Sequence, residues 1–283
     1  MIRQLAVVGV GLLGGSVAKA ARQGGLARRI VGIGRDAGRL QPALDDGTLD
    51  LAVTDLDAGV RDADFILLAA PVLTIEGLLE RVWRAAPAAG AVVTDVGSTK
   101  RNIVRAAERL AATRPLAFVG SHPMAGSEQA GYRVARPDLF RGATVIVTPT
   151  ETTELAALKK TTEFWEALGA RVSSLDPETH DRTVAAISHL PHLIACALVD
   201  GAARAEPAAL EFAARGFRDT TRIAGGDPDM WAEIFLANRD ALTATVEAFR
   251  EALGELQQVI DGDRADALRA VLARIKATRD QVR

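Results

Sequence analysis

Four histidines, at positions 122, 180, 189 and 192, are the side chains best suited to moving a proton near neutral pH. His122 stands in the stretch SHPMAGSE, residues 121–128, directly after a predicted strand. There it can accept or hold a proton, and the alternative is a hydrogen-bonded structural histidine. His189 and His192 are three residues apart and share a helix face. Further ligands at a suitable spacing are not evident, and we predict no metal site.

Hydroxyl and charged residues elsewhere suit substrate binding. Ser98 belongs to DVGSTK, residues 95–100, between a predicted strand and a helix, which is the ligand-binding edge of an open α/β sheet. A helix N-cap is its alternative role. Asp219 and Arg222 are three residues apart and can pair. The pair is either a surface ion pair or an arginine clamp for a substrate carboxylate.

A glycine-rich turn, GVGLLGGS at residues 9–16, follows an apolar run and opens an alanine-rich helix. Gly9 permits a tight turn, Gly11 lets the backbone approach phosphates, and Gly14 lets helix and strand pack closely. Free N–H groups at the helix N-terminus attract the pyrophosphate. We predict a dinucleotide site, the alternative being a purely structural turn. The predicted cofactor contacts are Gly9, Gly11, Leu12, Leu13, Gly14, Arg35, Ala70 and Pro71.

The end of the second predicted strand bears on the choice between NAD and NADP. An NAD site usually has an acid there to bind the ribose hydroxyls, but this position is Gly34, followed by Arg35. Glycine leaves room for a 2′-phosphate and arginine can neutralise it, so the sequence leans slightly toward NADP. In the alternative, Asp36 reaches back to the ribose of NAD.

Alternating strands and helices must position these residues. We predict strands at 5–8, 29–33, 65–70, 91–95, 117–120, 144–148 and 171–174. We predict helices between them at 12–23, 39–46, 74–86, 99–112 and 153–168. This alternation indicates an α/β fold, with a Rossmann-like doubly wound parallel sheet covered on both faces.

The second part of the chain reads as all-helical. Helices are predicted at 180–203, 207–214, 230–254 and 265–280. We therefore divide the chain into a dinucleotide-binding domain, 1–175, and a helical domain, 176–283. One helix carries an apolar seam with a period of 3.5, which suits either intrachain packing or a subunit interface. The seam residues are Leu242, Val246, Phe249, Leu253, Leu256 and Ile260.

Composition narrows the partners and the compartment. A net charge of -2 and an aromatic content of 4% argue against nucleic-acid binding. The one cysteine, Cys196, permits no intrachain disulfide and fits a reducing compartment. No signal peptide is visible, and no apolar run approaches the roughly 20 residues that span a bilayer. We expect a cytoplasmic protein without membrane or nucleic-acid partners.

Five separated motifs, taken together, resemble the prephenate/arogenate (cyclohexadienyl) dehydrogenase family of tyrosine biosynthesis, and the resemblance covers the whole chain. The motifs are GVGLLGGS (9–16), DVGSTK (95–100), SHPMAGSE (121–128), SHLPH (188–192) and GFRDTTRIAGG (216–226). The resemblance implies NAD(P)-dependent oxidative decarboxylation of prephenate to 4-hydroxyphenylpyruvate, or of arogenate to tyrosine. It also implies a helical domain that forms a homodimer, and it favours the seam as part of that interface.

The resemblance assigns roles to individual residues. His122 matches the catalytic histidine that accepts the proton of the ring hydroxyl, and Ser98 matches a serine that shares this contact. Arg222 matches the arginine that binds a substrate carboxylate, with Asp219 as its ion-pair partner. The residues implied to line the substrate pocket are His189 and Glu128.

Two other classes of function stay open. A 3-hydroxyacid-type dehydrogenase shares the two-domain plan but relies on a lysine in the helical domain, and residues 177–256 contain none. A non-enzymatic nicotinamide-sensing protein would bind the nucleotide without turnover. We expect no chorismate mutase segment and no regulatory domain, so that any feedback by tyrosine acts at the substrate site.

Overall fold

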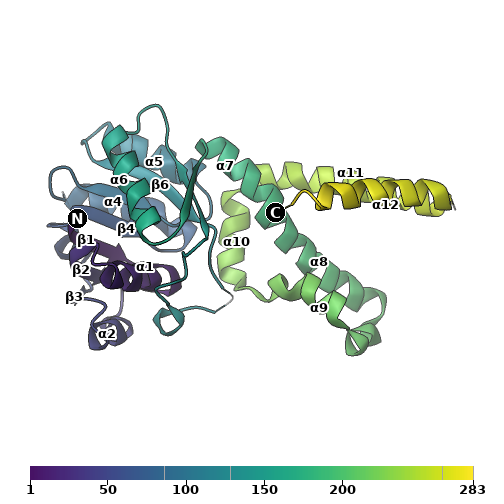
Figure 1. Ribbon diagram of the computed structural model, residues 1–283, viewed down its shortest axis with the longest axis horizontal. Coiled ribbons are helices and arrows are strands. Elements are labelled where there is room, and N and C mark those ends of the chain that lie inside the picture. The colour runs from purple at the N-terminus through teal and green to yellow at the C-terminus, as the bar shows by residue number, and fades with distance from the viewer. Residues whose placement is uncertain (86, 128, 263, 283) are drawn as a thin grey trace. The chain divides into compact units, whose positions relative to one another are not determined.

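Eight strands form one sheet at the centre of residues 1–238 in the computed structural model (Figure 1). Their order is β3-β2-β1-β4-β5-β6-β7-β8, and all neighbours are parallel except β6 and β7. The chain runs outward from β1 on one side and resumes with β4 on the other, which creates a switch point where ligands bind. The strands are β1 (Ile2–Val8), β2 (Ala27–Ile33), β3 (Leu51–Val53), β4 (Phe65–Leu68), β5 (Val92–Asp95), β6 (Ala117–Pro123), β7 (Thr144–Thr148) and β8 (Arg171–Ser174).

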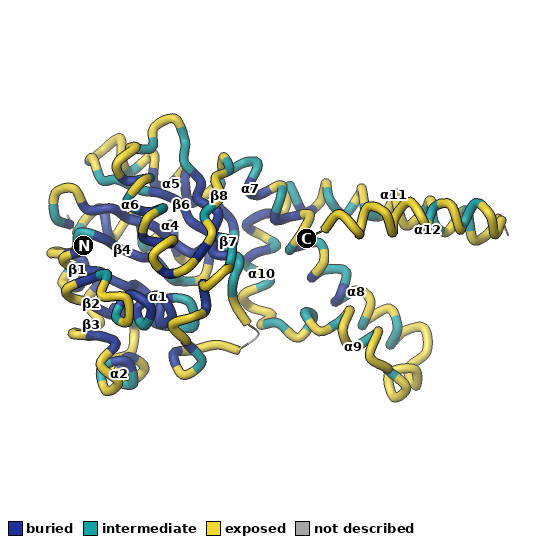
Figure 2. The backbone as a smooth tube through the Cα atoms, in the orientation of Figure 1, coloured by how far each residue is buried: buried dark blue, intermediate teal, exposed yellow. Residues whose placement is uncertain are grey.

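Helices cover both faces of this sheet. They are α1 (Leu12–Gln23), α2 (Ala37–Asp45), α3 (Leu56–Val60), α4 (Val72–Ala85), α5 (Arg101–Ala111) and α6 (Leu155–Ala167). Buried side chains of α1, α2 and α6 form one apolar core with the sheet, and those of α3, α4 and α5 form a second. Figure 2 shows the inner strands of the sheet as mostly buried, whereas the edge strands β3 and β8 are partly exposed. The sheet has apolar contacts on both faces, as expected for near-continuous apolar strands.

A run of helices follows β8 and packs on the same unit. Its members are α7 (Pro177–Val184), the π-helical turn η2 (Ala185–His189), α8 (Leu190–Ala205), the 3₁₀ turn η3 (Pro207–Phe212), α9 (Arg215–Thr221), the 3₁₀ turn η4 (Arg222–Gly225) and α10 (Pro228–Ala237). Helix α10 packs on α4, with Ile234 and Ala237 in the second core. The Glu233 carboxylate of α10 accepts a hydrogen bond from the Leu73 N–H at the start of α4, at 3.1 Å. These contacts hold part of the helical run against the sheet.

The π turn η2 has a local cause in the sequence. Pro191 lacks an N–H, and its ring would clash with the carbonyl of Ile187 in a regular α-helix. The chain widens instead, and the N–H of Leu190 bonds to the carbonyl of Ala185, five residues back. One inserted residue turns everything beyond it by about 100° relative to a regular helix. The turn therefore sets which side chains of α7 and α8 share a face.

The last two helices form a second compact unit, residues 239–283. Helix α12 (Ala265–Arg279) packs on α11 (Arg239–Asp261) and has no buried residue. The predicted seam lies on α11, where Leu242 is buried while Leu253 and Ile260 are 52% and 60% exposed. The two units divide at a different place from the predicted domain boundary near residue 175, which stays a prediction.

The structure describes residues 1–85, 87–127, 129–262 and 264–282, and over these it confirms the predicted α/β fold and corrects several details. The strand β3 and the helix α3 were not predicted, because both are short. Strand β6 runs three residues further than expected and pairs antiparallel with β7, so the sheet is mixed. The predicted helix 230–254 is two helices that meet at Asn238, and 207–214 is largely a 3₁₀ turn.

One expectation about membrane spans needs correction. Among the described residues, one continuous helix, Pro177–Ala205, is long and apolar enough to cross a membrane by length and composition. Only 28% of its most apolar window is buried. Its buried side chains include His180, Asp181, His189 and His192, and ionisable groups of this kind are costly in lipid. We therefore interpret its buried face as a protein-packing face.

Candidate functional site

The glycine turn after β1 has the geometry of a phosphate cradle. Gly9 has a φ of 94°, and a Cβ on it would lie 2.1 Å from the carbonyl oxygen of Ala69. A Cβ on Gly14 would lie 2.0 Å from the carbonyl oxygen of Gly9, so helix and turn touch directly. A Cβ on Gly11 would meet nothing within 4 Å, which leaves open space in front of the helix.

The start of α1 leaves backbone donors available to an anion. Its N-cap is Gly11, and no side chain caps it. The N–H groups of the first turn therefore lack the usual capping oxygen, and an anion is their natural partner. The pyrophosphate of a dinucleotide fits this cradle in charge and in space.

The remaining predicted cofactor residues surround the turn. Ala70 and Pro71 follow β4, and the Ala70 nitrogen lies 3.6 Å from the position of a Cβ on Gly9. Leu12 and Leu13 are half-buried and pack against the first core. The structure thus brings the glycine turn and the end of β4 together at one edge.

The residues after β2 bear on the two predictions for the adenosine ribose: Arg35 binding a 2′-phosphate, or Asp36 binding the ribose hydroxyls. Arg35 is exposed, and a Cβ on Gly34 would lie 3.1 Å from Leu40 Cδ2. Asp36 is the N-cap of α2, where its carboxylate accepts a hydrogen bond from the Gly38 N–H at 2.8 Å. Capping gives the Asp36 side chain a structural role, whereas the Arg35 side chain forms no ion pair with the described residues.

His122 lies inside β6, in register with Ile146 of β7, and is 8% exposed. Its Nδ1 is hydrogen-bonded to Nε2 of His180 at 2.9 Å. The Nδ1 of His180 is hydrogen-bonded in turn to Oδ1 of Asp181 at 2.8 Å. A buried chain of three titratable side chains therefore runs from the sheet into α7.

Backbone groups at the start of α5 hold Asp181 in place. Its Oδ1 accepts from the Lys100 N–H at 2.7 Å, and its Oδ2 accepts from the Arg101 N–H at 3.0 Å. Burial alone would raise the pKa of Asp181, but the hydrogen bonds from His180 and from these two amides outweigh it and hold the pKa below its usual value. The carboxylate therefore stays ionised.

Lys100 fixes the loop that carries Ser98. It is fully buried, forms an ion pair with Asp95 and donates to the Ser121 carbonyl at 2.9 Å. Asp95 also accepts from the Ser121 N–H at 3.1 Å. These contacts tie the β5–α5 loop to β6, immediately before His122. Ser98 itself is half-buried, and its hydroxyl has no hydrogen bond within the described residues.

The histidines of this region are held neutral. Burial, reinforced by the nearby His180 and Lys100, places the pKa of His122 well below the usual 6.5. Burial also lowers the pKa of His180, against the opposing effect of Asp181. For His189, burial lowers the pKa to about 4. At neutral pH each of these rings keeps a lone pair on one nitrogen.

A second group of buried polar atoms is linked to Asp181 through its backbone carbonyl. Asn238 donates to the Asp181 carbonyl at 2.8 Å and is 3.2 Å from His189 Nδ1. His192 stacks on Trp231, with ring centroids 3.6 Å apart. Three buried atoms here have no hydrogen-bond partner among the described residues: His189 Nε2, His192 Nδ1 and Asn238 Oδ1. Buried polar atoms normally have partners, so this group is poised to bind a polar ligand or water.

The predicted carboxylate clamp is arranged differently from expectation. Arg222, at the start of η4, is exposed. Asp219 was expected to pair with Arg222, but its Oδ2 lies 3.2 Å from Nε of Arg215. Arg215 and Asp219 are four residues apart on α9, a spacing that brings side chains together on a helix. That pairing prediction was wrong. Glu128, predicted to line the pocket, lies outside the described residues.

Sequence reasoning missed four residues that build the site: His180, Asp181, Asn238 and Lys100. His180 was noted only as one of four histidines. The available signal was a histidine followed by a carboxylate, nine residues before His189, on a predicted helix. Nothing in the sequence showed that this pair meets a histidine 58 residues earlier.

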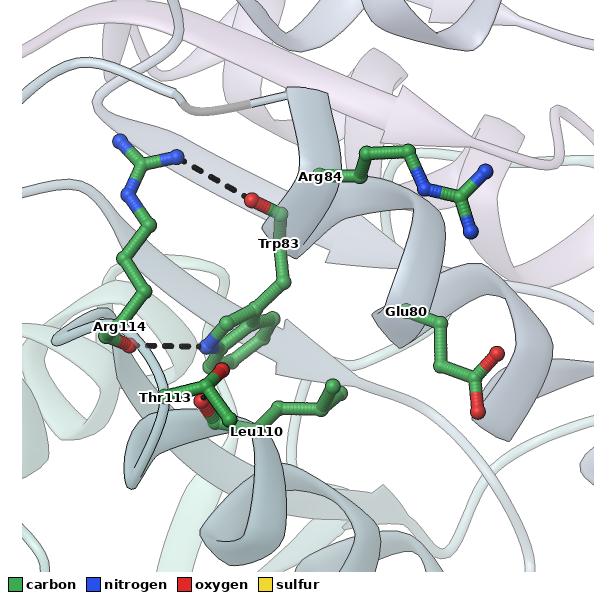
Figure 3. A pocket seen from close by; sticks show the side chains of 6 residues that line it. All are labelled: Glu80, Trp83, Arg84, Leu110, Thr113 and Arg114. Atoms are coloured by element: carbon green, nitrogen blue, oxygen red, sulfur yellow. Dashed lines mark hydrogen bonds between the residues drawn. The ribbon is translucent and has the colours of Figure 1, made fainter.

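A hollow on the surface lies away from this site (Figure 3). It is lined by Glu80, Trp83, Arg84, Leu110, Thr113 and Arg114. Trp83 Nε1 donates to the Arg114 carbonyl and Arg114 Nη1 donates to the Trp83 carbonyl, both at 3.1 Å. These residues belong to the ends of α4 and α5 that point away from the carboxyl edge of the sheet. The indole N–H of Trp83 and the guanidinium of Arg114 are therefore used within the fold.

The dinucleotide cradle, the buried histidine at the same sheet edge and the packed helical run define a nicotinamide-dependent dehydrogenase of the two-part α/β and helical kind. Residues 17–174 match the family described as prephenate dehydrogenase, nucleotide-binding domain, and residues 176–274 match prephenate dehydrogenase, dimerization domain. The chain belongs to the prephenate dehydrogenase family.

Individual relatives agree with this assignment. The chain is 33% identical over 277 residues to a prephenate dehydrogenase of Bacillus subtilis, covering 97% of this chain and 74% of the relative. The crystal structure of Aquifex aeolicus prephenate dehydrogenase in complex with hydroxyphenyl propionate and NAD⁺ has 33% identity and a TM-score of 0.92, over 100% of this chain and 99% of that one. The crystal structure of Synechocystis arogenate dehydrogenase has 31% identity and a TM-score of 0.85, over 98% of this chain and 99% of that one.

Proposed function

We propose that this chain catalyses the NAD(P)-dependent oxidative decarboxylation of prephenate to 4-hydroxyphenylpyruvate, with His122 as the proton acceptor. The observation that carries the proposal is the bonding of His122. Its Nδ1 is occupied by His180, while its Nε2 has no hydrogen-bond partner among the described residues. A neutral, buried imidazole with one nitrogen free is suited to act as a general base.

The reaction balances with His122 as the one base, because His122 takes a proton from the substrate and later returns it. The ring hydroxyl of the substrate gives its proton to His122, and the carbon that bears this hydroxyl loses a hydride. A dinucleotide held by its pyrophosphate at the glycine turn would supply the nicotinamide that accepts this hydride. The bond from the ring to its carboxylate then breaks, carbon dioxide leaves, and the bonding electrons complete the aromatic ring. His122 returns the proton to the ring oxygen, which gives the phenol.

Ser98 and Arg222 complete the proposed site. Ser98 stands in the loop whose next residues bind Asp181, and its free hydroxyl suits a second contact to the ring hydroxyl. Arg222 has its guanidinium at an exposed position and suits a substrate carboxylate. In this proposal His189 lines the pocket through its unpartnered Nε2, and Glu128 keeps its predicted role. Asp219, which pairs with Arg215, supports the arginine at most indirectly.

Prephenate and arogenate differ by a keto group against an amine on the side chain. The named relatives include enzymes for each substrate. We propose prephenate because the family matches in both halves of the chain carry that description. Arogenate, or both substrates, is the alternative.

The cofactor preference is a separate proposal. A structural neighbour was crystallised with NAD⁺, which supports NAD. Use of NADP as well is supported by the exposed Arg35 beside Gly34 and by the engagement of Asp36 as a helix cap. We propose that the site accepts both cofactors, with a slight preference for NADP.

We also propose a homodimer formed through the helical region. Several large apolar side chains within residues 176–274 are more than half exposed, which is costly for a monomer in water. They are Ile187, Phe212, Leu236, Leu253, Ile260 and Leu272. The cytoplasmic location and the absence of membrane and nucleic-acid partners stay predictions.

The test is a direct assay of turnover. Prephenate, and separately arogenate, is added with NAD⁺ or NADP⁺, and absorbance at 340 nm is followed. We expect His122→Asn to keep the fold and cofactor binding and to lose roughly 10²–10⁴-fold in kcat. Near-normal turnover by this variant would remove His122 from the mechanism, and no turnover with either substrate in the wild type would refute the function.

A further inference from the structure

We propose that His180 and Asp181 act as positioning residues that fix the tautomer of His122, so that its Nε2 presents a lone pair to the substrate. A buried chain of hydrogen bonds supports the proposal. His122 Nδ1 lies 2.9 Å from His180 Nε2, and His180 Nδ1 lies 2.8 Å from Asp181 Oδ1. Only the final step, use of that lone pair in catalysis, rests on the proposed function.

The direction of the hydrogen bonds starts at Asp181. Its two carboxylate oxygens face three groups: the N–H groups of Lys100 and Arg101, and Nδ1 of His180. The two amides can only donate, and an ionised carboxylate can only accept. The ring nitrogen at 2.8 Å must therefore carry a proton, so His180 has Nδ1–H.

The proton on His180 determines the next bond. A neutral imidazole has one N–H, so Nε2 of His180 is an acceptor. His180 is 0% exposed and lies close to the Lys100 ammonium, and both features oppose a second proton on the ring. The bond from Nε2 to His122 then requires Nδ1–H on His122. The lone pair of His122 is left on Nε2, which has no partner among the described residues.

The same arrangement stabilises the ring once it has taken a proton. Protonated His122 keeps its Nδ1–H on His180, and no further proton has to move. The Asp181 carboxylate lies beyond His180 and offsets the new positive charge across the buried chain. This resembles the general logic in which an acid orients a histidine base and stabilises its cation without itself being protonated.

This hydrogen-bonded chain of His122, His180 and Asp181, called the relay below, also joins two parts of the protein. His122 belongs to the sheet, whereas His180 and Asp181 belong to α7, and the amides that hold Asp181 start α5. Packing of α7 on the sheet is therefore needed to set the base, in addition to forming the pocket.

The first test reads the tautomers directly. The chain has only four histidines, so a two-bond ¹H–¹⁵N spectrum of protein labelled at histidine has only eight ring nitrogens to assign. At pH 7.5 we expect both His122 and His180 as the Nδ1–H form. A spectrum in which His122 carries its proton on Nε2, or is doubly protonated, overturns the proposal.

The second test removes the acceptor that His180 Nε2 offers to His122 Nδ1 in one variant, and replaces it with an amide oxygen in another. His180→Phe keeps an aromatic ring at this position but leaves His122 Nδ1 without an acceptor, whereas the amide oxygen of His180→Gln can reach the place of the lost Nε2. We expect His180→Phe to lose roughly 10²-fold or more in kcat. The KM and the NAD⁺ dissociation constant should change less than about threefold, and His180→Gln should recover at least about tenfold of the loss.

A matched control is Arg182→Gln, which removes an exposed charge from the same helix and should leave kcat unchanged. A His180→Phe enzyme within threefold of the wild type, or a His180→Gln enzyme as slow as His180→Phe, refutes the relay while the proposed function stands. The expected tautomers in a wild type that turns over neither substrate support the relay and refute the function. If His180→Phe does not fold, the wild-type spectrum and the kcat of His180→Gln still test whether His180 sets the tautomer of His122.

Discussion

His189 gives a quantitative prediction about stability and pH. The side chain is 1% exposed, and burial lowers its pKa to about 4, against 6.5 in an unfolded chain. Between these two values the unfolded state binds the proton and the folded state does not. The free energy of unfolding therefore rises with pH across this window, and the contribution of His189 is complete above pH 6.5 and is lost as the pH falls toward 4.

The size of the effect follows from the two pKa values. Between pH 7.5 and pH 5, the shift of about 2.5 units from 6.5 to about 4 predicts a loss of about 2 kcal/mol from this one side chain. Burial also lowers the pKa of His122, His180 and His192, so the wild type alone does not isolate His189. His189→Asn does isolate it, because the asparagine oxygen can still accept from Asn238 but does not titrate.

The measurement is urea unfolding of both proteins at pH 7.5 and pH 5, followed by tryptophan fluorescence at one fixed protein concentration. The cavity left by the substitution costs the same at both pH values and cancels in the comparison. We expect the gap in unfolding free energy between wild type and variant to shrink by about 2 kcal/mol at pH 5. A gap that stays constant within error would show that His189 is not a buried neutral histidine.

Two further variants test the ligand contacts. Arg35→Gln should weaken NADP⁺ binding by roughly tenfold while NAD⁺ binding changes little, as measured by fluorescence titration, because only the 2′-phosphate needs the charge; equal losses for both cofactors would contradict the assignment. Arg222→Ala should raise the KM for the substrate roughly 10–100-fold with a smaller effect on kcat, measured by steady-state kinetics. An unchanged KM would exclude the clamp.

The fold was predictable from the sequence because its signals are local. The apolar run before Gly9 and the alanine-rich stretch after it determine a strand and a helix that the structure places at Ile2–Val8 and Leu12–Gln23. The failures were the short elements and the continuation of β6, where propensity is weak and sheet pairing decides the boundary.

The site was predictable only in part, because its contacts are tertiary. His122 was found from its place after a strand, but its bond to His180 spans 58 residues and has no local signature. The pairing of Asp219 failed for a different reason. Both Arg215 and Arg222 lie within helical reach of it, and on an exposed helix small differences in side-chain geometry decide between them.

The π turn between α7 and α8 constrains the number of residues in this part of the chain. The extra residue in Ala185–His189 rotates the rest of the helix by about 100° relative to a regular one. Deleting any one residue there would turn His189 away from Asn238 and His192 away from Trp231, while leaving His180 in place. An insertion or deletion between His180 and His192 should therefore disturb the site more than a substitution at an exposed position of the same segment.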